Sequence, residues 1–269
     1  MEFLKIVRRR SFLSEVVYTV LNIALAVGIV LIIRATESPW LAVGLVLLSK
    51  WRVLAVRPRY WFVNIQSNLV DFIVSISTVI FLYTTYVGAT DPSQKLIIMG
   101  ILTALYIGWL LFLKPRSKRS YVVAQAGVAL FTGVTALYII SYAWPASLVV
   151  LAMWLIGYAT ARHVFSSYDE THILFLSLLW GVVLAEIGWL AYHWTVAYAP
   201  LGLENVLFPR VSLTVFCIGF ILHRAYDSFY HHQKVRGNDI LLPILFTASI
   251  IIVLPLILNL LGASVTIGI

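Results

Sequence analysis

Long stretches without a charged residue dominate this chain of 269 residues. Lys, Arg, Asp and Glu are absent from positions 120 to 161, a run of 42 residues. As a single helix this run would measure about 63 Å, roughly twice the hydrocarbon layer of a bilayer. We therefore expect two membrane-spanning helices here, joined by a tight hairpin at residues 141–145, where Pro145 suits the first turn of a helix.

The overall composition indicates the same class of protein. Hydrophobic residues make up 61% of the chain and charged residues 11%. One soluble core of this size cannot bury so much apolar surface, so the surplus is expected to face lipid. We predict an all-α polytopic membrane helix bundle, a single transmembrane domain over residues 1–269 with about nine spans. The predicted spans lie near 15–33, 39–56, 67–86, 95–113, 121–140, 146–162, 171–194, 210–229 and 240–261, after a basic segment at 1–14.

The distribution of Lys and Arg predicts the orientation of the bundle. Short loops that stay in the cytoplasm carry an excess of these residues, so they place the N-terminus in the cytoplasm and the C-terminus outside. Arg34, Lys95 and Arg210 fall on the opposite side. The sixteen residues on the predicted cytoplasmic side are Lys5, Arg8, Arg9, Arg10, Lys50, Arg52, Arg57, Arg59, Lys114, Arg116, Lys118, Arg119, Arg162, Arg224, Lys234 and Arg236.

This split requires both short candidates, near 39–56 and 210–229, to span. Lys50, Arg52 and Arg224 are then expected to extend to the inner interface. The basic loops also account for the net charge of +8, because they would lie against anionic lipid headgroups. The predicted partner is the lipid bilayer, with a second membrane protein or a homo-oligomer left open, and nucleic acid is not expected. No P-loop or Gly-rich dinucleotide motif is present, so an ATP-driven pump would need a partner chain. No cofactor is predicted.

Two carboxylates, Glu186 and Asp71, are expected to lie within the hydrocarbon layer and are the main candidate site residues. Glu186 is about seven residues from the outer end of its span, roughly 10 Å below the interface, and His193 shares its helix face. A carboxyl buried there would serve a proton-coupled carrier, although an inert, hydrogen-bonded Glu fits as well. Asp71 lies near the cytoplasmic end of the third span, where we expect a structural ion pair with Arg57 or Arg59, or contact with water.

A second set of candidates lies where the eighth span leaves the membrane. His223, Asp227 and His231 are spaced i, i+4, i+8 along one helix face, the residue types that hold Zn or Fe. They would serve a metal-dependent enzyme that modifies lipids at the cytoplasmic membrane face. The motif H-E-x-x-H is absent, and the simpler interpretation is an i, i+3 pair between Arg224 and Asp227 with solvated histidines around it.

Residues 179–194 read Leu-Trp-Gly-Val-Val-Leu-Ala-Glu-Ile-Gly-Trp-Leu-Ala-Tyr-His-Trp. This stretch resembles a segment of uncharacterised multi-pass membrane proteins of ultrasmall, candidate-phyla bacteria. The resemblance implies an integral protein of the bacterial cytoplasmic (inner) membrane. It implies no substrate, cofactor or site residue.

The leading functional hypothesis is a proton-coupled secondary transporter of a small or lipid-linked solute, with Glu186 as the proton-binding residue and Asp71 as a candidate second member of one polar centre. An intramembrane acid without a soluble energy-coupling domain is typical of such carriers. A non-catalytic membrane scaffold or assembly subunit is the first alternative. The metal-dependent enzyme is the second.

Overall fold

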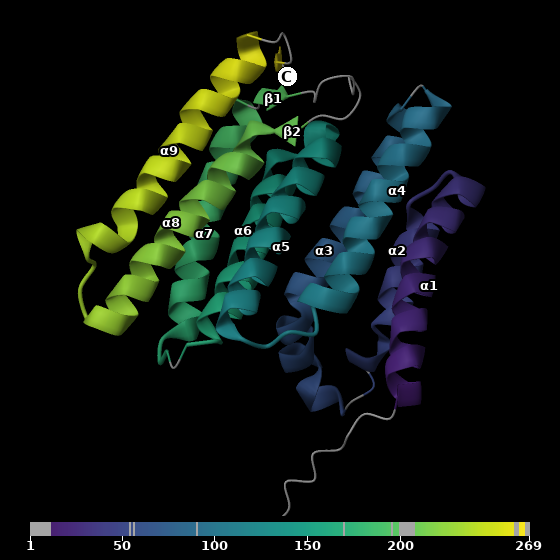
Figure 1. Ribbon diagram of the computed structural model, residues 1–269, viewed down its shortest axis with the longest axis horizontal. Helices are drawn as coiled ribbons and strands as arrows, with labels where there is room; N and C mark the ends of the chain where they lie inside the picture. Colours follow the sequence, from purple (N-terminus) through teal and green to yellow (C-terminus); the bar gives the residue numbers. More distant parts are fainter. Residues whose placement is uncertain are drawn as a thin grey trace, which may run out of the picture.

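The computed structural model describes residues 12–53, 55, 57–89, 91–168, 170–194, 196–198, 208–260 and 264–266. Within these ranges the chain forms nine α-helices, which run alternately up and down (Figure 1). They are α1 (Phe12–Thr36), α2 (Trp40–Ser49), α3 (Trp61–Gly88), α4 (Pro92–Gly108), α5 (Arg119–Ile140), α6 (Ala146–Phe165), α7 (Ile173–His193), α8 (Arg210–His232) and α9 (Gly237–Leu260).

Several short elements connect or extend the helices. Three are 3-10 turns: η1 (Trp51–Val53), η2 (Pro58–Tyr60) and η4 (Ser141–Ala143). A π-helical turn, η3 (Trp109–Leu113), continues α4. The predicted hairpin at 141–145 is confirmed, since α5 ends at Ile140 and α6 begins directly after Pro145.

A small antiparallel sheet is an addition to the predicted all-α fold. Its strands are β1 (Val196–Tyr198), β2 (Phe208–Pro209) and β3 (Ser264–Thr266), in the order β2-β1-β3. Ala197 is paired with Pro209 on one side and with Val265 on the other. Strands of two or three residues have no periodicity to read, so the sequence pattern did not predict them. Residues 199–207, which belong to the connection between the predicted spans 171–194 and 210–229, lie outside the described residues.

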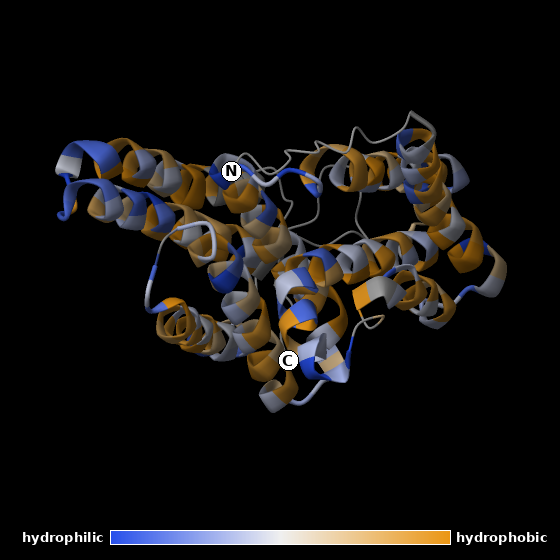
Figure 2. Cartoon of the chain, turned by 90° about the horizontal axis from the view of Figure 1, so that it is seen from below, coloured by the Kyte–Doolittle hydropathy of each residue, from blue (hydrophilic) through white to orange (hydrophobic). Residues whose placement is uncertain are grey.

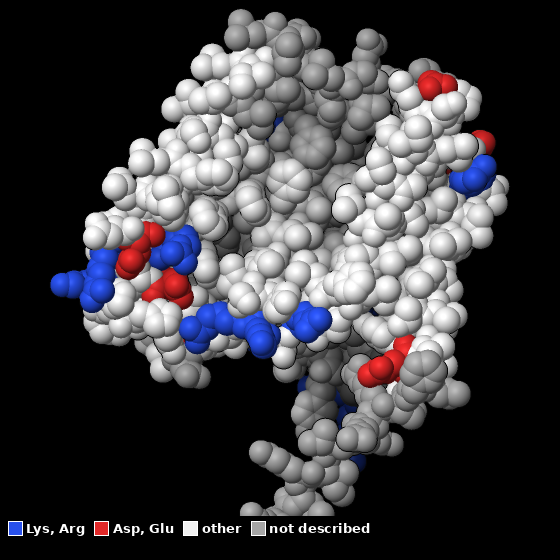
Figure 3. Space-filling model, viewed as in Figure 1, with Lys and Arg blue, Asp and Glu red and all other residues white. Residues whose placement is uncertain are grey.

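Six helical segments in the described part are long and apolar enough to cross a membrane. Apolar residues cover their sides, and charged residues gather at the ends and loops, leaving a broad uncharged band between them (Figures 2 and 3). The protein is therefore a membrane-embedded helical protein that contacts lipid. The six segments are Ser14–Thr36, Pro58–Gly88, Pro92–Leu113, Arg119–Ala143, Ala146–Phe165 and Ile173–His193.

The other three predicted spans differ from this set. The helix expected near 39–56 ends at Ser49, so α2 has ten residues and a length of about 15 Å, half of the hydrocarbon layer. Helix α8 has 23 residues but is not among the six. The apolar part of α9, Gly237–Val253, is too short for a full membrane span. A nine-span topology and its orientation remain predictions.

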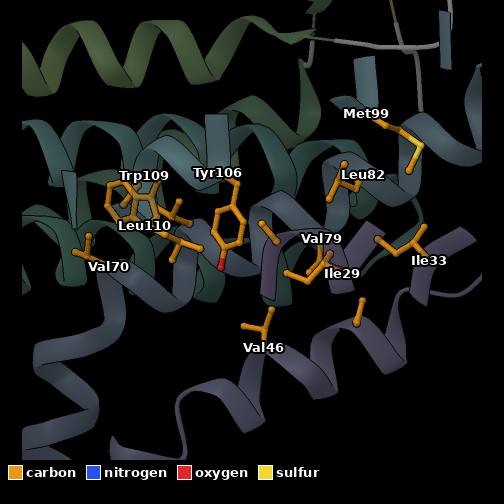
Figure 4. Close-up of a cluster of buried hydrophobic side chains, with 14 residues drawn as sticks. Ile29, Ile33, Val46, Val70, Val79, Leu82, Met99, Tyr106, Trp109 and Leu110 are labelled. Carbon is orange, nitrogen blue, oxygen red and sulfur yellow. The ribbon is translucent and has the colours of Figure 1, made fainter. Parts of the chain in front are cut away.

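The helices pack as two groups that meet at α3. One apolar cluster joins α1 to α4 and includes Ile29, Val46, Leu82 and Leu110 (Figure 4). A second cluster joins α5 to α8. Ile73 of α3 packs against both clusters, so α3 lies between the two halves of the bundle. The core on each side of α3 is apolar, which makes the few charged side chains inside it conspicuous.

Close packing between α6 and α7 decides which face of α7 is buried. A Cβ atom added to Gly157 would lie 3.1 Å from the Cα of Gly181, so the two backbones approach too closely for a larger residue. Small residues allow this approach between membrane helices. A Cβ on Gly188 would lie 2.6 Å from the Cγ of Met153. The glycine face of α7 therefore turns toward α6, and the opposite face turns outward.

Candidate functional site

Asp71 of α3 lies at the centre of a buried cluster of charged and polar side chains, which we call the Asp71 cluster. It consists of Lys50, Asp71, Trp109 and Lys114. The Lys50 ammonium contacts Oδ2 of Asp71, and Lys114 Nζ lies 2.8 Å from the same oxygen. The indole Nε1 of Trp109 donates a hydrogen bond to Oδ1 at 3.2 Å. One carboxylate thus accepts from two cations and an indole.

The cluster forms where two helices lose regular α-helical structure. Lys50 is the residue at the C-terminal end of α2, and Lys114 is the residue at the C-terminal end of the π-helical turn η3. Trp109 begins that turn. Carbonyl groups at the end of a helix carry a partial negative charge, so both ends favour a cation. The helix ends and the carboxylate together explain why two ammonium groups lie so close to each other.

A line of hydroxyl groups continues from the cluster into the bundle. Lys50 Nζ also lies 3.4 Å from the backbone oxygen of Asp71, and Ser75 Oγ donates to that oxygen at 2.6 Å. The hydroxyl of Tyr106 donates to Ser75 Oγ at 3.0 Å. Tyr106 lies beside Trp109 and Leu110 in the apolar cluster (Figure 4). Polar contacts therefore run along α3 from the end of α2 into the apolar interior.

Burial distinguishes the two lysines. The side chain of Lys50 is 6% exposed and that of Lys114 is 34% exposed, while Asp71 is 11% exposed. Lys114 therefore connects the buried carboxylate to the end of the bundle at which the α4–α5 loop lies, which we call the basic end. Charge counting leaves one excess positive charge when all three groups are ionised. Buried ionisable groups are rarely left so unbalanced unless helix ends or a function compensate them.

Two expectations about this region are wrong. The ion pair expected at Asp71 is present, but the expected contacts, Arg57, Arg59 or water, are wrong, since the partners are Lys50 and Lys114. Lys50 was predicted to reach the membrane interface, whereas α2 ends early and the lysine turns inward onto α3. One sequence feature could have indicated these partners: both lysines directly follow an apolar helical run. Pattern alone could not show that the two runs end beside the same carboxylate.

Glu186 lies on the outer face of α7, not in a polar centre of the bundle. The residue is exposed, and among the described residues it makes no hydrogen bond or ion pair. It borders a shallow depression lined also by Val150 of α6 and by Trp189. Trp189 borders the same depression as Glu186, and its ring lies 5.0 Å from that of His193 in an edge-to-face contact, so the predicted shared face of Glu186 and His193 is confirmed. Glu186 and Asp71 thus belong to separate places in the fold.

The predicted metal-site candidates His223 and Asp227 of α8 are linked through a tyrosine that the sequence pattern did not reveal. The hydroxyl of Tyr168, in the turn after α6, donates to Asp227 Oδ1 at 3.0 Å and lies 3.2 Å from His223 Nε2. His231 Nδ1 is 2.8 Å from the backbone oxygen of Asp227 and 3.5 Å from its Oδ1. The predicted i, i+3 pair is present, with Arg224 3.8 Å from Asp227.

These contacts tie the α6–α7 turn to α8. Burial, followed by the hydrogen bond to Asp227, raises the pKa of Tyr168. The Arg119 guanidinium lies over the Tyr168 ring at 4.2 Å. The Tyr226 hydroxyl donates to Glu170 Oε2 at 2.5 Å, and this hydrogen bond holds the pKa of the Glu170 carboxyl below its usual range. The arrangement is a hydrogen-bonded network at the basic end, in which Nδ1 of His223 is buried without a hydrogen-bond partner among the described residues.

No group of three His, Cys, Asp or Glu side chains is placed to hold a metal ion in the part of the chain that the structure describes. His223, Asp227 and His231 lie along one helix face, as predicted, but Tyr168 occupies the space between His223 and Asp227. These three residues therefore do not form the assembled metal site that the hypothesis of a metal-dependent enzyme requires.

Comparison with known proteins assigns no relatives to this arrangement. No family model, no curated protein and no solved structure matches the chain.

Proposed function

We propose that this membrane protein is a proton-coupled secondary transporter of a small or lipid-linked solute, with the Asp71 cluster as its proton-binding site. One observation carries the proposal: the buried carboxylate of Asp71 contacts the buried ammonium group of Lys50 and the half-buried one of Lys114, where α2 ends and α4 becomes a π-helical turn. Ionisable groups inside membrane helices are rare and mark ion and proton pathways. The proposal moves the proton site from Glu186 to the Asp71 cluster.

Interrupted helices support this assignment. In secondary transporters, substrates and coupling ions bind where membrane helices are discontinuous, because unwound backbone supplies free polar groups. A π-helical turn inside a helix is also frequent at functional sites. Here α2 stops after about 15 Å, and η3 lies beside its end, so both interruptions meet at Asp71.

Charge counting identifies the group that exchanges the proton. The fully ionised cluster carries one excess positive charge, and loss of one proton from Lys50 makes it neutral. Lys50 is the more buried of the two ammonium groups, so water stabilises its charged form less than that of Lys114. Lys114 stays hydrated and provides the route to water at the basic end. A site that gains and loses one charge in this way can couple proton movement to a conformational change.

Charge displacement in proteoliposomes adsorbed to a solid-supported membrane tests the proposal without knowledge of the solute. A rapid pH step should produce a transient current in the wild-type protein and no such current with Asp71→Asn. Lys50→Arg is the decisive variant, because a guanidinium keeps the positive charge but does not release its proton near neutral pH. Its current should be lost while the fold remains stable.

Glu186→Gln is the matched control, since it removes the carboxyl of the other candidate site residue without touching the cluster. We expect it to keep the wild-type current. A wild-type protein without a current would contradict the transporter proposal. A current that persists in Lys50→Arg would show that Lys50 is not the exchanging group, and a current lost only in Glu186→Gln would return the proton site to α7.

A further inference from the structure

One face of α7 carries a regular row of exposed side chains, which we call the α7 seam. Its residues follow a repeat of four and three positions, the spacing with which one helix packs along another. Glu186 is the only acidic residue in the row, and the other members except His193 are apolar or aromatic. The α7 seam consists of Phe175, Leu179, Val182, Glu186, Trp189 and His193, all exposed.

The same spacing on the inner side of α7 is already filled. Ser177, Gly181, Leu184 and Gly188 are buried, and three of them contact or closely approach residues of α6. The helix therefore has two seams of matching geometry. In the described part of the protein only the inner one is covered, and the outer one remains free for a partner.

A carboxyl group at the centre of an exposed membrane seam needs an explanation. Lipid offers it no hydrogen-bond donor, and an unsatisfied polar group in hydrocarbon is costly. The depression beside it is bordered by apolar side chains, among them Val150, Val182 and Leu190. Trp189 and His193 lie farther along the seam and pair with each other. The described residues therefore supply Glu186 with no hydrogen-bond donor.

We propose that the α7 seam binds a transmembrane helix of another protein, and that this helix presents a side-chain hydrogen-bond donor, such as Asn, Gln or Lys, to Glu186. Charge complementarity identifies the occupant. A parallel second copy of α7 would bring Glu186 against Glu186, which places two acceptors of like charge together. A donor-bearing helix instead satisfies the carboxyl and matches the apolar residues on both sides, and a single polar position of this kind defines the register between helices.

Binding of synthetic transmembrane helices tests this assignment. The probe is a Leu/Ala helix of about 20 residues with one Asn about seven residues from one end and an acceptor dye, and the matched probe carries Leu in place of Asn. The protein carries a donor dye at Thr171→Cys in a Cys217→Ala background. Energy transfer in liposomes should show about tenfold tighter binding of the Asn probe, the effect expected of one hydrogen bond between membrane helices.

The variants separate the carboxyl from the general apolar surface. Glu186→Leu should bind both probes equally, and Glu186→Gln should keep most of the preference, because an amide also accepts a hydrogen bond. Leu105→Ala, at an exposed position of α4, should leave the preference unchanged. Equal binding of both probes by the wild-type protein, or an unchanged preference in Glu186→Leu, would overturn the proposal. A wild-type dimer that dissociates in Glu186→Leu would assign the seam to a second copy and overturn it as well.

Discussion

Loss of Asp71 should destabilise the protein much more than loss of Lys50. Asp71→Ala leaves the two ammonium groups of Lys50 and Lys114 close together without their shared counter-charge. Lys50→Met keeps a flexible side chain of similar length and leaves a one-to-one pair between Asp71 and Lys114. The two variants remove opposite signs of charge from a cluster that holds one excess positive charge, so their effects should differ.

The geometry sets the size of the difference. At the 2.8 Å between Lys114 Nζ and Asp71 Oδ2, an effective dielectric constant of about 20 gives an attraction of about 6 kcal/mol. Desolvation of both ions offsets much of this attraction, and water screens Lys114, whose side chain is 34% exposed. Removing one partner of a buried pair costs about 3–5 kcal/mol, the range we expect for Asp71→Ala. Replacing the redundant cation in Lys50→Met should cost at most about 1 kcal/mol.

The free energy of unfolding can be measured in mixed micelles by titration with a denaturing detergent, with tryptophan fluorescence as the signal. Glu186→Gln serves as the control, because Glu186 is exposed and has no partner among the described residues, and we expect a change within about 0.5 kcal/mol. If the free energy of unfolding of Asp71→Ala is within about 1 kcal/mol of the wild-type value, the ion pairs of Asp71 do not hold the cluster together. Equal losses of unfolding free energy in Asp71→Ala and Lys50→Met would refute the argument that the cluster holds one excess positive charge.

Three further predictions address other parts of the structure. Trp109→Phe removes the indole donor to the buried carboxylate and should lower the free energy of unfolding by about 1.5–3 kcal/mol in the same titration. Gly157→Ala forces α6 and α7 apart and should cost about 1–3 kcal/mol, whereas Gly100→Ala, which meets no atom within 4 Å, should be neutral or slightly stabilising. Tyr226→Phe should raise the pKa of Glu170 toward its usual value in a carbon NMR titration of the carboxyl group. The hydrogen bond favours the carboxylate, so its stabilisation is present above the usual pKa of Glu and is lost as the pH falls through the lowered value; an unchanged titration would contradict this assignment.

The sequence by itself determined the class of the protein and the course of most helices. Crossing a hydrocarbon layer requires long uncharged stretches, and these are local properties of the chain. The run without charge at 120–161 therefore predicted two helices and a hairpin, and α5 and α6 turn at that place. The i, i+3 contact between Arg224 and Asp227 was predictable for the same reason, since both residues lie on one helix.

Only the tertiary structure decided how the charged residues are used. Lys50 and Trp109 are 21 and 38 positions away from Asp71, and no local periodicity brings them together. The outward position of Glu186 depends on glycines that draw the other face of α7 against α6. A charge in a membrane segment must find a partner or remain exposed, and which of the two happens depends on how neighbouring helices pack. Packing made Asp71 the centre of a buried cluster and left Glu186 on the surface.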